Sequence, residues 1–215
     1  EPERAAAVPG FLVAEHVNVL VALAIFSIFF FVFLALSRRG RTLYLRRIPG
    51  VAAIEEAIGR ATEMGRPVLY VPGIDPIEEI QTLASIAILS HVSRKVAEYN
   101  ADIIVPTRDS IVMSICEETV RESYTAAGRP DAYQPDNIRF LSDEQFAFTA
   151  GVDGIMLRER PAANIYLGSF YAESLILAET GFASGAIQVA GTASLAQLPF
   201  FVTACDYTII AEEFY

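Results

Sequence analysis

VLYVPGIDPIEEIQTLASIAILSHVSRKVAEYNADIIVPTRD, residues 68–109, is the stretch that decides the fold class. Its two ends, Val68–Val71 and Ile103–Val105, are short apolar runs rich in β-branched residues, and such runs predict buried strands. Pro72-Gly73 ends the first run, and Asp75-Pro76 predicts the start of a helix of residues 76–99 with Asp75 as its N-cap. A strand, a long helix and a second strand in this order are typical of a parallel sheet wrapped by helices.

The same alternation continues toward the C-terminus. Helices are predicted at 109–127, 144–152 and 170–179, strands at 138–141, 164–167 and 186–189, and a last extended segment at 200–210. A further helix, 51–64, precedes the first strand, because apolar residues recur there at helical spacing. The sequence therefore predicts an α/β fold, an open, mostly parallel sheet of five or six strands with flanking helices in a Rossmann-like three-layer arrangement.

An uncharged apolar run of twenty residues, Val17–Leu36, lies ahead of this domain. As a helix it would measure roughly 30 Å, the thickness of the hydrocarbon core of a bilayer. A buried core helix is usually shorter, and it rarely carries large side chains such as Phe29, Phe30 and Phe31 together on all faces. A secretory signal peptide begins with basic residues, whereas this chain begins with Glu1 and Glu3. The sequence predicts a single transmembrane helix of residues 17–36.

A cluster of arginines follows the apolar run and sets its predicted orientation. The positive-inside rule places this flank in the cytoplasm. Residues 1–16 then form a short extracytoplasmic tail, 37–50 a basic juxtamembrane linker and 51–215 a cytoplasmic domain anchored to the inner membrane. The arginines expected to contact lipid headgroups are Arg38, Arg39, Arg41, Arg46 and Arg47.

The charge of the domain excludes one class of partner. Residues 48–215 carry ten basic and 23 acidic side chains, and an acidic surface repels nucleic acid. We therefore expect no nucleic-acid partner. Cys116 and Cys205 lie in apolar stretches, and in a cytoplasmic domain they are expected to be reduced, structural thiols.

Familiar catalytic motifs do not occur in this sequence. His91 is the single histidine after residue 48, so a histidine-based triad or zinc site within one chain would have to use it. Its apolar helical surroundings favour a hydrogen-bonded core or interface residue instead. There is no Walker A loop, and the first strand turns through Pro72-Gly73-Ile74-Asp75 without the three glycines of a dinucleotide site. We predict no metal and no cofactor.

One edge of the predicted sheet gathers polar residues. Ligands of open parallel sheets bind outside the carboxyl ends of the strands. Helix N-termini and Arg108 would favour an anion there, and Asp75, Asp109 and Asp143 would suit Mg²⁺. N-capping alone explains the same residue types at strand-to-helix junctions. The candidate ligand-binding residues are Gly73, Asp75, Thr107, Arg108, Asp109, Ser142, Asp143 and Ser169.

Other acidic residues raise separate questions. Glu117, Glu118 and Glu122 are expected to form a solvated helix face. Glu173 has mostly apolar neighbours, so if buried it needs a partner, for which Arg158 or Arg160 is the candidate. Asp206, between Cys205 and Tyr207, raises the same question.

Four segments together resemble an uncharacterised family of bacterial and archaeal membrane-anchored proteins. They are Ile103–Asp109, Ala126–Tyr133, Phe170–Ser174 and Gln197–Phe201. The similarity covers most of residues 48–215. The resemblance implies a prokaryotic membrane protein, and it supplies no activity or catalytic residues.

Two functions are compatible with these features. The leading hypothesis is a non-catalytic, membrane-anchored scaffold or assembly module that forms homo-oligomers or binds other membrane proteins. It is based on the apolar span, the acidic domain, the lack of catalytic motifs and the predicted helix 76–99. This helix is too apolar for one buried face and should find a partner. The alternative is a domain, binding or enzymatic, that takes a nucleotide or phosphorylated metabolite at the strand ends, with Arg108 contacting the anion.

Overall fold

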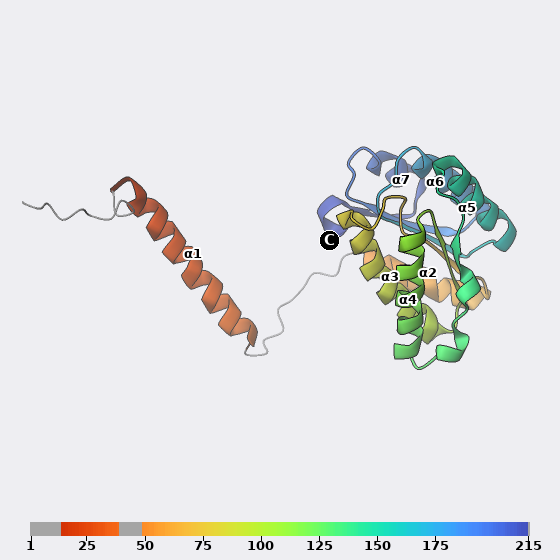
Figure 1. Ribbon diagram of the computed structural model, residues 1–215, viewed down its shortest axis with the longest axis horizontal. Coiled ribbons are helices and arrows are strands. Elements are labelled where there is room, and N and C mark those ends of the chain that lie inside the picture. Colours follow the sequence, from red (N-terminus) through yellow and green to blue (C-terminus); the bar gives the residue numbers. More distant parts are fainter. Residues whose placement is uncertain (1–13, 39–48, 215) are drawn as a thin grey trace, which may run out of the picture. The chain divides into compact units, whose positions relative to one another are not determined.

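The computed structural model describes residues 14–38 and 49–214, which form two units treated separately below. The first unit is one continuous helix, α1 (Ala14–Arg38) (Figure 1). Within it, Val17–Ser37 is long and apolar enough to cross a membrane. The predicted helix is therefore confirmed, while Arg39, Arg41, Arg46 and Arg47 lie outside the described residues.

The second unit contains an open sheet of six strands, all parallel, in the order β3-β2-β1-β4-β5-β6. The chain builds outward from the central strand β1 to β3 on one side, and then returns to lay β4, β5 and β6 on the other. The strands are β1 (Val68–Val71), β2 (Ile103–Thr107), β3 (Ile138–Phe140), β4 (Ala163–Leu167), β5 (Ile187–Thr192) and β6 (Tyr207–Ile210).

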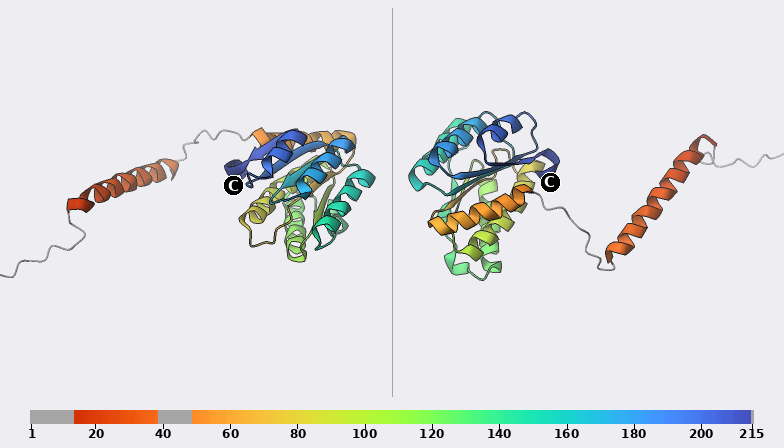
Figure 2. Two further views of the ribbon diagram at one scale, coloured as in Figure 1. Left: turned by 90° about the horizontal axis from the view of Figure 1, so that it is seen from above. Right: turned by 180° about the vertical axis from the view of Figure 1, so that it is seen from behind.

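Helices cover both faces of the sheet and make three layers (Figures 1 and 2). On one face lie α2 (Pro49–Met64), α3 (Ile80–Tyr99) and α4 (Ser110–Ala126). On the other lie α5 (Gln145–Glu159), α6 (Glu173–Ser184) and α7 (Leu198–Ala204). Short 3-10 turns are η2 (Pro130–Ala132), η3 (Pro135–Asn137) and η4 (Ala211–Phe214). The predicted α/β fold class is confirmed.

The alternation of side chains along each strand divides the core in two. In β1, Val68 and Tyr70 pack with α2, α3 and α4, whereas Leu69 and Val71 pack with α5, α6 and α7. Because both faces are covered, all four residues are fully buried. This explains why the strands appear in the sequence as continuous apolar runs instead of alternating ones.

Three expectations on the later elements differ from the structure. The segment 200–210 is not one extended stretch, because its first part belongs to α7 and only Tyr207–Ile210 forms a strand. Leu198 and Phe201 are both buried, and their spacing of three residues fits one face of a helix. The helix predicted at 170–179 begins later and extends to Ser184, and the helix predicted at 144–152 continues to Glu159.

The helix predicted at 76–99 also differs from the structure. It begins at Ile80, and the residues before it form a turn in which the Glu79 N–H donates to the Pro76 carbonyl over 3.2 Å. Asp75 is therefore not its N-cap. Packing between α2 and α4 explains the apolar character of α3, because most of its apolar side chains contact these two helices or the sheet. Ile80 and Leu83, on the first turn of α3, are large apolar residues that stay strongly exposed.

Candidate functional site

The carboxyl ends of the strands form the edge at which the candidate ligand-binding residues were predicted. Gly73 and Asp75 follow β1, Thr107 ends β2, and Arg108 and Asp109 come directly after it. Ser142 and Asp143 follow β3, and Ser169 follows β4. Since β1 and β4 are neighbours whose connections leave in opposite directions, the topological switch point lies between them. Ligands of Rossmann-like domains bind in the crevice at such a point.

Backbone fills this crevice. The Ile74 N–H donates to the Ser169 carbonyl over 3.0 Å, which joins the loop after β1 to the loop after β4. Gly73 and Gly168 both have positive φ angles, +90° and +142°. A Cβ atom added at Gly168 would lie 2.4 Å from the Pro72 carbonyl oxygen. The two loops therefore meet backbone to backbone, and they occupy the position that a dinucleotide takes in a Rossmann-like enzyme.

Arg108 holds a second pair of loops together. Its Nη1 donates to the Ile74 carbonyl over 3.1 Å, and its Nε donates to the Asp143 carbonyl over 2.8 Å. The half-buried guanidinium is thus tied to backbone from two loops. Beside it lies a hollow of about 190 Å³ lined by Ile74, Pro76, Arg108, Asp109 and Asp143. The structure brings together three of the predicted residues here, and this hollow is below the usual size of a ligand pocket. A second, more open hollow of about 580 Å³ shares Arg108 and Asp143 with it and is also lined by Glu144 and Gln145.

Carboxylates cap the helices that begin at this edge. Asp109 Oδ1 accepts from the Ile111 and Val112 N–H groups over 2.7 and 3.0 Å, which confirms its role as the N-cap of α4. Glu144 Oε2 accepts from the Ala147 N–H at the start of α5 over 2.6 Å. These N–H groups are the donors that an anion would use. Because acidic side chains already occupy them, the edge disfavours a phosphate.

The remaining predicted residues serve the structure in other ways. Ser142 Oγ accepts from the Glu144 N–H over 3.1 Å, and the buried Thr107 hydroxyl donates to the Arg139 carbonyl over 3.3 Å. Asp75 Oδ2 accepts from the Tyr171 hydroxyl over 3.3 Å. The negative charge of Asp75 is the main cause that raises the pKa of Tyr171. In the part of the chain that the structure describes, no three His, Cys, Asp or Glu side chains form a group suited to a metal ion.

The buried acidic residue is Glu173, and its partners differ from those expected. Its side chain is fully buried at the start of α6. It accepts from the Tyr171 N–H over 2.7 Å and from the Gln145 side-chain amide. Neither Arg158 nor Arg160 pairs with it among the described contacts. Asp206 is exposed, and its carboxylate, just ahead of β6, accepts from the Gln188 N–H of β5 over 2.8 Å.

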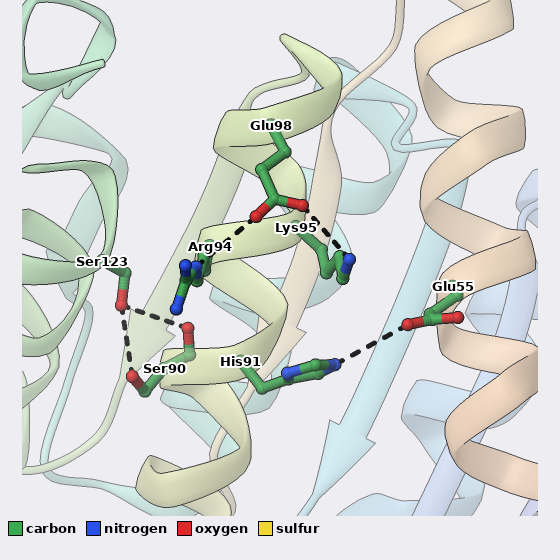
Figure 3. A network of polar contacts seen from close by, with 7 residues as sticks. All are labelled: Glu55, Ser90, His91, Arg94, Lys95, Glu98 and Ser123. Carbon is green, nitrogen blue, oxygen red and sulfur yellow. Dashed lines mark hydrogen bonds and ion pairs between the residues drawn. The ribbon is translucent and has the colours of Figure 1, made fainter. Parts of the chain in front are cut away.

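His91 is not a core residue, because its side chain is 50% exposed. Figure 3 shows it on α3, turned toward Glu55 of α2, with 3.9 Å between Nε2 and Oε1. On the other side of α3, Ser90 and Ser123 contact each other through their hydroxyl groups over 3.3 Å. These contacts join α3 to both neighbouring helices. The expectation that His91 is a core residue is wrong, and its place at an interface stays a prediction.

Sequence reasoning missed two glutamines near the strand ends. Gln145 donates to Glu173, and Gln81 Oε1 accepts from the Thr192 hydroxyl and the Ala193 N–H over 3.2 and 3.0 Å. Gln145 follows Ser142-Asp143-Glu144, and Gln81 lies shortly after Glu78-Glu79. Neither glutamine stands out from these polar neighbours, so the sequence holds no signal for their contacts.

Arg108→Ala is expected to lower the free energy of unfolding by about 1–2 kcal/mol, because two backbone carbonyls lose a charged donor. Urea denaturation of the full chain in a mild nonionic detergent measures this loss. Arg94→Ala serves as the control, since Arg94 is exposed and pairs only with Glu98, a surface contact worth at most about 1 kcal/mol. Equal losses in both variants would contradict the bracing role of Arg108.

The sequence profile of DUF6754, described as a domain of unknown function, matches residues 7–215. No curated protein and no solved structure matches the chain.

Proposed function

The chain belongs to the DUF6754 family, whose function is unknown, and we propose a function from the structure. The proposed function is that of a membrane-anchored, non-catalytic assembly module. The proposal is that copies of the domain associate through the outer surface of α6 and α7. The prokaryotic origin implied by the sequence resemblance is part of the same proposal.

The outward face of α6 carries the proposal. Its exposed positions include Leu175, Ile176 and Phe182, so α6 is apolar on the side facing solvent as well as on the side facing the sheet. A helix that is apolar all round is normally buried. The neighbouring loop and α7 add further exposed apolar side chains, Leu195, Phe200 and Val202. We name these six residues the α6–α7 surface.

The charges around the α6–α7 surface favour a second copy as its partner. Residues 161–215 contain no lysine or arginine, and Glu179 is the exposed charged residue within α6. Two copies related by a twofold axis bring the same surface together. With six uncharged contact residues, such a contact buries apolar area and requires no charge pairing across its centre.

The strand-end edge gives less support to the alternative, ligand binding. Its crevice is filled by the Gly73 and Gly168 backbones, its helix N-termini are capped, and Arg108 is bound to two carbonyls. The spaces left for a ligand at the predicted residues are the small hollow beside Arg108 and a more open one of about 580 Å³ that shares Arg108 and Asp143 with it. A nucleotide or phosphorylated metabolite would have to displace these internal contacts.

The double variant Leu175→Glu and Ile176→Glu tests the assembly. Light scattering in nonionic detergent is expected to give a dimeric mass for the wild-type chain and a monomeric mass for the variant, because like charges then meet across the contact. Ile80→Glu with Leu83→Glu is the matched control, since these residues are exposed on α3 instead. A monomeric wild type would overturn self-assembly and leave a different membrane protein as the partner. An oligomer that survives in the α6 variant would assign assembly to another surface.

We also propose that α1 spans the inner membrane with the N-terminus outside. Five arginines lie between Arg38 and Arg47 on one flank, against Arg4 on the other. Single cysteines introduced as Ala6→Cys and Glu122→Cys report the two sides. A membrane-impermeant thiol reagent added to intact cells is expected to label the first and spare the second. Burial raises the pKa of Cys116 and of Cys205 to about 12, so the native thiols give little background. Labelling of the Glu122→Cys reporter alone would show that the orientation is opposite to the one proposed.

A further inference from the structure

A pocket lies at the opposite edge of the sheet, near the amino ends of the strands. It has a volume of about 580 Å³ and is lined by Arg66, Met156, Leu157, Arg160, Ala183 and Ser184. Arg66 stands shortly before β1, Arg160 shortly before β4, and Ser184 shortly before β5. We name it the Arg66–Arg160 pocket. Its size falls within the range of small-molecule sites.

The charge of this pocket differs from that of the domain. Two of its six lining residues are arginines and none is acidic, although acidic residues outnumber basic ones by 23 to ten after residue 48. Among the described contacts, neither Arg66 nor Arg160 forms an ion pair, whereas Arg94, Arg121 and Arg139 each pair with a glutamate. Two guanidinium groups without a carboxylate partner indicate a site for an anion.

Backbone contacts fix one of the two arginines in place. Arg66 Nε donates to the Arg160 carbonyl, and Arg66 Nη2 donates to the Pro161 carbonyl over 3.4 Å. Arg160 itself adopts a left-handed conformation with φ of +48°. A guanidinium carries five N–H donors, so Arg66 keeps donors for a ligand after making these bonds. Its orientation is set before a ligand arrives, which lowers the entropic cost of binding.

The remaining lining is mostly apolar. Leu157 and Ala183 contribute hydrocarbon surface, and Leu157 is 60% exposed, whereas Met156 is fully buried beneath them. An anion that also has an apolar part would contact both kinds of surface. A small inorganic ion would leave the apolar part of the pocket unused.

We propose that the Arg66–Arg160 pocket binds the phosphate group of an anionic phospholipid. The guanidinium groups hold the phosphate oxygens, and the glycerol and first acyl carbons lie against Leu157 and Ala183. The choice of a lipid over a soluble phosphate rests on the apolar lining and on the membrane anchor proposed above. Exposed apolar and basic residues side by side are typical of surfaces that contact anionic bilayers.

Native mass spectrometry of the full chain in nonionic detergent tests this assignment. The probes are dihexanoyl-phosphatidylglycerol, its zwitterionic phosphatidylcholine analogue and inorganic phosphate. The wild-type chain is expected to retain the phosphatidylglycerol in preference to the other two. Arg160→Gln removes one charged donor from an exposed side chain and is expected to weaken this retention about tenfold.

Two further variants keep the result interpretable. Ala183→Glu places a carboxylate at an exposed helical position in the pocket and is expected to abolish preferential retention. Arg94→Gln, on the exposed side of α3, is expected to retain phosphatidylglycerol as the wild type does. The arginines near α1 contribute the same background to every variant.

Several outcomes would overturn the proposal. Unchanged retention in Arg160→Gln and Ala183→Glu would place the lipid elsewhere, and an equal loss in Arg94→Gln would show nonspecific attraction. Equal binding of inorganic phosphate would assign the pocket to a soluble anion. Alkaline carbonate extraction tests the membrane anchor separately. If carbonate extracts the chain while its selectivity for phosphatidylglycerol persists, the proposed membrane anchor is wrong and the proposed lipid site is retained.

Discussion

Gly168→Ala is expected to lower the free energy of unfolding of the domain by about 3–5 kcal/mol, the strain of a positive φ added to a backbone collision. Gly168 has a φ of +142°, which L side chains rarely adopt. Its added Cβ would also lie 2.4 Å from the Pro72 oxygen and 2.9 Å from the Pro72 carbonyl carbon. Neither neighbour is a flexible side chain, so the two loops would have to separate.

Gly128→Ala is the matched control for this experiment. Gly128 also has a positive φ, +75°, but a Cβ added there would have no atom within 4 Å. Its loss is therefore expected to come from strain alone, about 1–2 kcal/mol. Urea denaturation of both variants, as full chains in detergent, separates strain from collision. Similar losses at the two positions would show that the crevice can open, and would make it available to a ligand.

The second large effect is expected at Gln188, in the middle layer of the domain. Its side chain is 1% exposed. Its Nε2 donates to the carbonyls of Ala178 in α6 and Ala204 in α7, over 3.0 and 2.9 Å, and its Oε1 accepts from the Tyr166 hydroxyl over 3.0 Å. This one amide therefore joins two helices to two strands of the sheet.

Gln188→Leu is expected to cost about 3 kcal/mol, because buried polar groups in three other residues lose a hydrogen-bond partner that leucine cannot replace. The measurement is the same urea denaturation. Gln134→Leu, at an exposed position, is expected to change the free energy of unfolding by no more than about 0.5 kcal/mol. If the two glutamine variants were equally stable, the amide network would have no net stabilising role.

The strands were predictable because a strand that is buried on both faces consists of consecutive apolar residues. Val68–Val71 was predicted to the residue, and Ile103–Thr107 only had to be extended past Pro106. The prediction for segment 200–210 was wrong because it relied on the same signal, a short apolar run. A short apolar run has no period that separates a buried strand from a buried helix, and α7 is only seven residues long.

The strand-end residues were predictable as a group, but their roles were not. The order of strands and helices along the chain is enough to place Arg108, Asp109 and Asp143 at one edge. That the Gly73 and Gly168 loops meet depends on β1 pairing with β4, which is a tertiary fact. The partner of Glu173 is likewise an amide from another helix, Gln145, and nothing local in the sequence connects the two.

The central position of β1 has a consequence for how the protein is made. One side of this strand pairs with β2 soon after both are synthesised, but the other side waits for β4, in which Ala163 pairs with Val68. Closing so long a loop is slow, and until then an apolar strand has an unpaired edge open to other chains. The nascent polypeptide is therefore most prone to aggregate when it has been translated as far as β3. An arrest of synthesis at that point should increase its association with chaperones.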